Sequence, residues 1–96
     1  MEVNINKEIV SRSLDTYGNG IQLVVCMEEL SELTQAISKE IRGKDNRNNL
    51  VEEMADVHIM IEQVLRHYWQ DGDGKLDYYI NEKLTRQLGR IADEDK

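Results

Sequence analysis

The chain has 96 residues, 19 of them acidic and 12 basic, and its formal net charge at pH 7 is −7. Hydrophobic residues make up 40% of the sequence, which is enough for a packed core and argues against wholesale disorder. The acidic balance excludes a general duplex-DNA binder, which needs a basic face to displace counterions. The single cysteine, Cys26, excludes a disulfide framework and a cysteine-based zinc site.

No apolar run approaches the length of a membrane-spanning helix, and the N-terminal residues lack a basic segment followed by an apolar one. We therefore expect a cytoplasmic protein that binds neither a membrane nor a nucleic-acid polymer. A lone cysteine suits the same reducing compartment. The length predicts a single domain over residues 1–96.

Proline is absent and β-branched alternation is rare, so the sequence predicts helices throughout. We expect Gly18 to end the first helix, Asn19 to cap the second, Gly43 to close it, and an asparagine to cap the third. The expected helices span residues 5–17, 20–42, 49–69 and 75–92, with a polar loop over 44–48, a turn over 70–74 and a frayed tail over 93–96.

The short loop between the two long middle helices predicts an antiparallel hairpin. The expected fold class is therefore all-α: a small bundle of about four helices around this hairpin, completed by oligomerisation. Apolar spacing predicts the buried faces. In the first helix the expected core residues are Ile5, Ile9, Val10 and Leu14; in the second they are Leu23, Cys26, Met27, Leu30, Leu33, Thr34, Ile37 and Ile41; in the third they are Leu50, Met54, Val57, Ile61, Val64, Leu65 and Tyr68.

Each middle helix carries a second stripe that contains two carboxylates. The stripe is Val25, Glu29, Glu32 and Ala36 on one helix and Glu53, Asp56, Met60 and His67 on the other. Residues three apart lie about 5–6 Å apart on a helix surface, so like charges there repel unless something offsets them. In an antiparallel hairpin the two pairs face one groove, with Glu28 and Glu52 just outside it. Such oxygen ligands suit Mg²⁺ or Mn²⁺.

A solvated acidic face is the simpler interpretation of these residues, because Glu-x-x-Glu pairs are common in helices. Two pairs on adjacent helices, each bordered by apolar residues, are much less common. Gathering so many carboxylates away from water costs several kcal/mol unless a cation offsets their charge. We therefore favour a metal site.

The run Glu28-Glu29-Leu30-Ser31-Glu32, followed after twenty residues by Glu53-Met54-Ala55-Asp56, reads EExxE…ExxD. This double motif resembles that of the MazG-like all-α nucleoside triphosphate pyrophosphohydrolase superfamily. The flanking residues Tyr17-Gly18, Gln22 and Asn49-Leu50-Val51-Glu52 add to the resemblance. Residues 81–86 look like the family's later Asn-x-Lys-x-x-Arg segment. The similarity is strong over about residues 17–65 and weaker beyond.

The resemblance implies Mg²⁺-dependent hydrolysis of a nucleoside or deoxynucleoside triphosphate to the monophosphate and pyrophosphate, with Mn²⁺ as a candidate substitute. It implies a homodimer or homotetramer, which the two stripes on each middle helix favour independently. Glu28 matches the extra acidic position of the motif, which orients a ligand or the water. The implied metal ligands are Glu29, Glu32, Glu53 and Asp56, and the implied phosphate contacts are Asn81, Lys83 and Arg86.

A general base and further cations complete the expected site. We expect Glu28 or Glu32, whichever is not fully engaged with metal, to accept the proton of the attacking water. Lys44 and Arg47, just before or at the start of the third helix, are either phosphate ligands or ordinary surface charges. No segment identifies the base of the substrate.

Other sites fit the sequence less well. Neither His58 nor His67 has a Glu three residues before it, so a ferritin-like di-iron site lacks its ligands. Residues 71–82 resemble an EF-hand loop, but Lys75 and Leu76 replace an acidic ligand and the required glycine. The remaining alternative is a non-catalytic helical module that oligomerises or regulates a partner through an acidic face.

Overall fold

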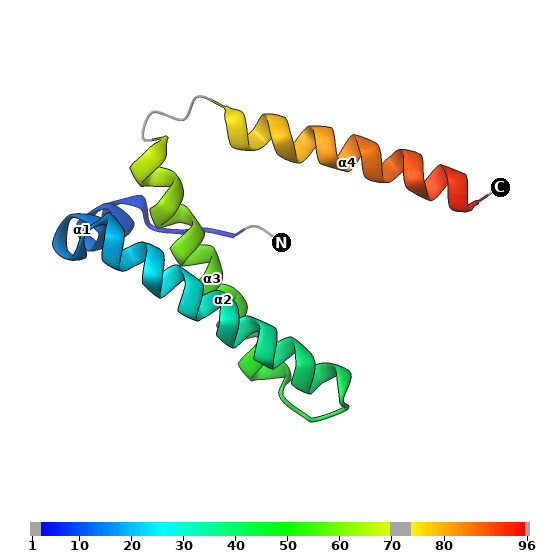
Figure 1. Ribbon diagram of the computed structural model, residues 1–96, viewed down its shortest axis with the longest axis horizontal. Helices are drawn as coiled ribbons and strands as arrows, with labels where there is room; N and C mark the ends of the chain where they lie inside the picture. Colours follow the sequence, from blue (N-terminus) through cyan, green and yellow to red (C-terminus); the bar gives the residue numbers. More distant parts are fainter. Residues whose placement is uncertain (1–2, 70–73, 96) are drawn as a thin grey trace.

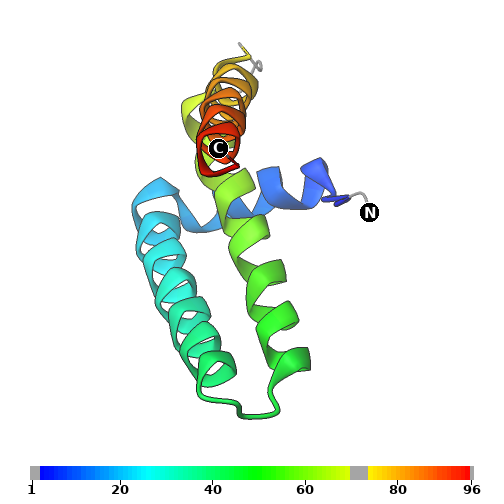
Figure 2. The same ribbon diagram turned by 90° about the vertical axis from the view of Figure 1, so that its right-hand side faces the viewer.

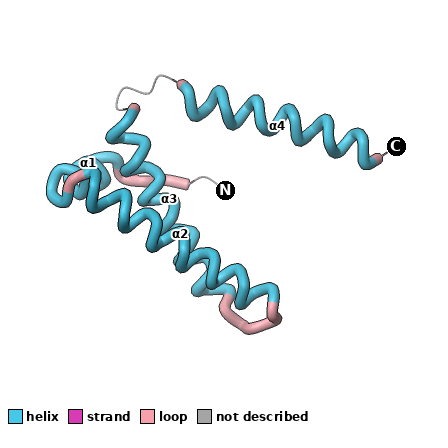
Figure 3. Tube along the Cα trace, viewed as in Figure 1, coloured by secondary structure: helices cyan, strands magenta, loops and turns pink. Residues whose placement is uncertain are grey.

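The computed structural model describes residues 3–69 and 74–95, which form helices joined by short loops (Figure 1). The described residues contain no strand (Figure 3), so the predicted all-α class is confirmed. None of the described helices is long and apolar enough to cross a membrane. Apart from Gly74, the turn predicted over 70–74 lies outside the described residues. The helices are α1 (Lys7–Tyr17), α2 (Asn19–Ile41), α3 (Arg47–Tyr68) and α4 (Lys75–Glu94).

Glycine and asparagine set the ends of α1. The side chain of Asn6 accepts a hydrogen bond from the backbone N–H of Ile9 at 3.1 Å, so the helix begins two residues later than expected. Gly18 ends it as predicted, with φ +84° and its N–H donating to the Leu14 carbonyl at 2.8 Å. Gly18 is also the N-cap residue of α2, so the expected capping role of Asn19 is wrong. The Asn19 amide instead donates to the Tyr68 hydroxyl at 3.4 Å.

The loop of the hairpin is tied back to α2. Gly43 follows the helix with φ +76°, as its predicted closing role requires. The residue at the N-cap of α3 is Asn46, whose side-chain amide donates to the Ala36 carbonyl at 3.0 Å rather than capping its own helix. At the other end of the chain, α4 continues to Glu94, two residues beyond its expected end at residue 92.

Helices α2 and α3 run antiparallel, and α1 crosses them near the start of α2 and the end of α3 (Figure 2). Helix α1 buries Val10 and Leu14, whereas Ile9, expected inside, is exposed. Lys7 reaches Glu62 of α3 in an exposed ion pair of 2.5 Å, a kind of contact that contributes less than about 1 kcal/mol. Helix α1 therefore covers the hairpin only at the start of α2 and the end of α3.

The inner face of the hairpin differs from the expected core. Ala36 is 1% exposed, whereas Met27 and Ile41 are 71% and 80% exposed. The cause is that α3 covers only one side of α2, and this side is the stripe that holds Val25 and Glu29. Of the other residues expected in the core, Val57 is buried, Leu23, Cys26, Leu33, Leu50, Val64 and Leu65 are half-buried, and Leu30, Thr34, Ile37, Met54, Ile61 and Tyr68 are exposed.

A polar contact lies inside the three-helix unit. Gln22 of α2 and Gln63 of α3 are both buried, and the Gln22 amide donates to the Gln63 side-chain oxygen. The same amide donates to the Ser13 hydroxyl of α1 at 3.0 Å. A buried amide left without a partner costs about 1–3 kcal/mol, so this contact fixes how the three helices are aligned.

Helix α4 stands apart from this unit. No Cα atom of α4 lies within 8 Å of a Cα atom in the other described helices, and every described residue of α4 is exposed. The radius of gyration is 16.4 Å, against about 12.5 Å for a compact domain of this length. In a single copy, therefore, the bundle consists of α1, α2 and α3.

Candidate metal centre

Three carboxylates from two helices converge inside the α2–α3 hairpin. Glu29 projects from α2, and Glu53 and Asp56 project from α3 one turn apart. One carboxylate oxygen of each lies within 4.8 Å of one from each of the others. Two oxygens bound to one Mg²⁺ ion lie about 3 to 4.2 Å apart, from metal–oxygen distances of about 2.1 Å in an octahedron. Side-chain rotations that shorten the longer separations would let all three share one cation.

Two of these carboxylates are partly withdrawn from water. Glu29 and Glu53 are half-buried, and one oxygen of each is buried without a hydrogen-bond partner. Buried polar atoms in folded proteins are normally paired, and an unpaired buried anion is costly. A divalent cation would supply the missing partner to both atoms, so the donor set fits a hard metal ion.

The electrostatics of the cluster agree with its geometry. Burial, followed by repulsion from the Asp56, Glu32 and Glu53 carboxylates, raises the pKa of Glu29. Burial, followed by repulsion from Glu32 and Asp56, likewise raises the pKa of Glu53. The Asp56 side chain is close enough to Glu29 to share a hydrogen bond when one of the two is protonated. The site thus resists full ionisation in the absence of a cation.

The other acidic residues expected in the site lie at its edge. Glu32 is exposed but interacts with Glu53, close enough for a hydrogen bond when one carboxyl is protonated. The structure therefore brings together all four residues predicted as ligands, three of them as a tight group. Glu28 and Glu52 are exposed on the same two helices, and Glu52 adds to the repulsion at Glu53.

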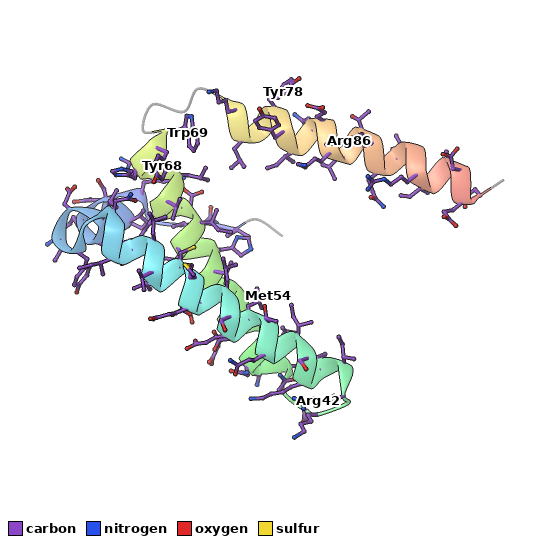
Figure 4. All side chains as sticks on the ribbon, in the orientation of Figure 1. Arg42, Met54, Tyr68, Trp69, Tyr78 and Arg86 are labelled. Carbon is purple, nitrogen blue, oxygen red and sulfur yellow. The ribbon has the colours of Figure 1, made fainter. Side chains whose placement is uncertain are left out.

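The residues expected to contact phosphates are not near the carboxylates of their own chain. Asn81, Lys83 and Arg86 lie on α4, and Figure 4 shows Arg86 far from the hairpin that carries Met54. Lys83 and Arg86 do share a shallow groove of about 200 Å³ with Gln87 and Arg90. Sequence reasoning missed Arg90, although its helical spacing from Lys83 and Arg86 was a usable signal.

The hairpin loop holds the two remaining cations. Lys44 lies in the loop and Arg47 is the first residue of α3, and both are exposed. Arg47 precedes Glu53 by six residues, which is about 9 Å along the helix axis. At about 100° per residue, Arg47 also lies about 120° around α3 from Glu53, so the structure does not bring it to the carboxylates.

A larger groove lies at the opposite end of α3. It encloses about 500 Å³ and is lined by Glu62, Leu65, Arg66 and Trp69 of α3 and its C-cap, together with Lys7 and the start of α4. Leu65 is twelve residues beyond Glu53, about 18 Å along the axis, so this groove does not open onto the carboxylates. His58 and His67 are exposed, and the His67 ring packs edge-on against Tyr68.

Comparison with protein-family models, with curated proteins and with solved structures found no match for this chain.

Proposed function

We propose that this protein is a Mg²⁺-dependent pyrophosphohydrolase that converts a nucleoside or deoxynucleoside triphosphate to the monophosphate and pyrophosphate. The supporting observation is the convergence of Glu29, Glu53 and Asp56, with two buried carboxylate oxygens that lack a protein partner. The double acidic motif supports a place in the MazG-like superfamily. We place the protein in the cytoplasm, as a homodimer or homotetramer.

We assign two roles to the carboxylates by their place in the cluster. Glu29, Glu53 and Asp56 would hold Mg²⁺ (or Mn²⁺), with Glu32 completing the set from the edge. When bound, the metal neutralises phosphate charge and polarises the phosphoryl group that is attacked. Glu28 and Glu32 are exposed at the rim, where a carboxylate oxygen can take the proton of the attacking water.

Positive side chains would balance the charge of the departing pyrophosphate. Lys83 and Arg86 form a cationic edge on α4, and Asn81 adds an amide donor to the same helix. Because α4 is remote from the carboxylates of its own chain, these residues would act in a site that belongs to another copy. Arg47, near the start of α3, is the cation nearest in sequence to Glu53 on its own chain.

A turnover assay tests the proposal directly. The protein is incubated with Mg²⁺ and a panel of common and damaged (deoxy)nucleoside triphosphates, and pyrophosphate release is measured. Glu53→Gln should abolish release without loss of helicity, because the amide cannot supply an anionic ligand. Glu40→Gln, an exposed change near the end of α2, is the matched control and should keep full activity. No turnover of any nucleotide at high enzyme concentration would overturn the proposal.

The second candidate is a non-catalytic helical module, favoured by the large apolar residues that this chain leaves exposed. Calorimetric titration with Mg²⁺ or Mn²⁺ separates it from an enzyme at an earlier step. The enzyme requires ion binding that Glu53→Gln weakens, whereas a module whose acidic face serves only solubility binds no ion there. Ion binding without turnover would leave the module, with an ion-assisted assembly, as the surviving function.

A further inference from the structure

The single chain exposes more surface than a compact monomer of its size. Its accessible surface is 7867 Å², whereas a folded monomer of this mass is expected to expose about 5,700 Å². The excess, on the order of 2,000 Å², is larger than the roughly 800 Å² that each partner contributes to a standard interface. The excess is therefore large enough to supply an interface with a second chain.

One part of the excess is an apolar face on the hairpin. It consists of large side chains that the packing of α2 on α3 leaves outside. With about 100° of rotation per residue, these side chains of both helices lie to one side of the contact between α2 and α3. Glu32 and Asp56 lie to the other side of this contact. We call this set the hairpin face: Met27, Leu30, Ile37 and Ile41 of α2 with Met54 and Ile61 of α3, all exposed.

The other part is an apolar stripe on α4. Its members recur every three or four residues, which places them along one side of the helix. A helix of 20 residues is only marginally stable in water unless its apolar side packs on another surface. We call this set the α4 stripe: Leu76, Ile80, Leu84, Leu88 and Ile91, all exposed.

We propose that two copies of this chain exchange α4, so that the α4 stripe of each copy packs on the hairpin face of the other. Helices α2 and α4 are each on the order of 30 Å long, so the two surfaces match in length. In a pair with two-fold symmetry the same contact forms twice, which covers both apolar surfaces of both chains. The exchange specifies which surfaces form the interface of the homodimer included in the proposed function.

The exchange is compatible with the carboxylate site. The hairpin face and the open side of the cluster, marked by Glu32 and Asp56, lie on opposite sides of the hairpin. A docked α4 therefore leaves the carboxylates accessible to a metal ion and a substrate, and its Lys83 and Arg86 would reach only the carboxylates of a copy outside the exchanged pair. The exchange depends on apolar surface alone, so two copies would assemble in this way even if the protein hydrolyses no nucleotide.

Light scattering after size-exclusion chromatography tests the exchange with two complementary variants. Ile37→Asp places a charge on the hairpin face, and Leu88→Asp places one on the α4 stripe. Each should weaken assembly on the order of a hundredfold, because docking would bury an unpaired charge. Gln35→Asp and Thr85→Asp add the same charge to other sides of α2 and α4 and should leave the mass unchanged. Circular dichroism confirms that each variant keeps its helices.

Mixing the two defective variants gives the decisive measurement. The intact α4 of Ile37→Asp can dock on the intact hairpin face of Leu88→Asp, so a mixed dimer should form where neither variant assembles alone. A wild-type chain of monomer mass would overturn the exchange, as would a wild-type oligomer that Leu88→Asp leaves intact. If Leu88→Asp leaves the oligomer intact, the oligomeric state of the proposed function stands, but its interface is formed by the hairpins without α4.

Discussion

The carboxyl groups of Glu29 and Glu53 reach into the contact between α2 and α3, where each has a buried oxygen without a hydrogen-bond partner. Packing alone favours an apolar residue at such a position, because an unpaired anion loses its hydration. The arrangement is stable when each carboxyl is protonated or when a cation lies between them. Protons and a divalent cation are therefore expected to compete for the same carboxylates, and either one should relieve their repulsion.

The raised pKa values of Glu29 and Glu53 predict how stability changes with pH in a chelator. Above the ordinary carboxyl pKa of about 4.5 and up to the raised value, the folded chain holds more protons than the unfolded chain. The free energy of unfolding then falls as pH rises through this window. Melting temperatures recorded in EDTA should therefore decrease from mildly acidic to neutral pH. Mg²⁺ should restore stability at neutral pH and have little effect where the carboxyls are protonated.

Asp56→Asn is the control for this pH profile. The amide keeps the shape of the side chain but removes a charge that raises the pKa values of both Glu29 and Glu53. The variant should melt at a higher temperature than the wild type in EDTA at neutral pH, by about 2–4 °C if relief of the repulsion is worth about 0.5 kcal/mol. It should also gain less from Mg²⁺. A profile identical to that of the wild type would place the pH dependence elsewhere in the chain.

Helical spacing alone identified which carboxylates meet, because Glu29 and Glu32, or Glu53 and Asp56, share one side of a rigid helix. Spacing did not show which of two candidate stripes on α2 faces α3. Met27 and Ile41 are more apolar than Ala36, yet Ala36 is buried and they are not. Both stripes have helical spacing, and the surface that buries one of them belongs to α3, which is distant in sequence.

The sequence predicted the ends of the helices more closely than it predicted their buried faces, because the ends depend on local turn residues. Gly18 was expected to end α1 because glycine alone tolerates the backbone required there, and it adopts φ +84° and ψ 156°. The start of α3 was misjudged because Asn46 uses its side chain on Ala36 across the hairpin rather than on its own helix. A local capping rule cannot anticipate a partner that is distant in sequence.

Two glycines at the α1–α2 junction give a matched test of this backbone argument. A Cβ added to Gly18 or Gly20 meets no atom within 4 Å, so the two sites differ only in conformation. Gly18→Ala should destabilise the fold by about 1–3 kcal/mol, because L-residues rarely adopt its φ and ψ. Gly20→Ala, inside α2, should stabilise it by about 0.5 kcal/mol through lower entropy of the unfolded chain.

Urea denaturation followed by circular dichroism measures both changes. The slope of the unfolding free energy against urea should be the same in both variants, since neither alters the surface exposed on unfolding. Equal effects of the two substitutions would show that the junction is flexible enough to absorb an alanine at Gly18.

At the scale of the whole molecule, the described chain buries few apolar residues, and no Cα atom of α4 lies within 8 Å of a Cα atom in another described helix. If assembly supplies the missing burial, unfolding is coupled to dissociation, and the melting temperature must depend on protein concentration. A tenfold increase in concentration is worth about 1.4 kcal/mol to a dimer. For two chains of this length that amounts to a rise of about 3–5 °C. Calorimetry over a hundredfold range measures this rise, which Leu88→Asp should remove and Thr85→Asp should retain. A wild-type melting temperature that is constant over that range would mean that the three packed helices of one copy are sufficient for stability, and that α4 contributes nothing to it.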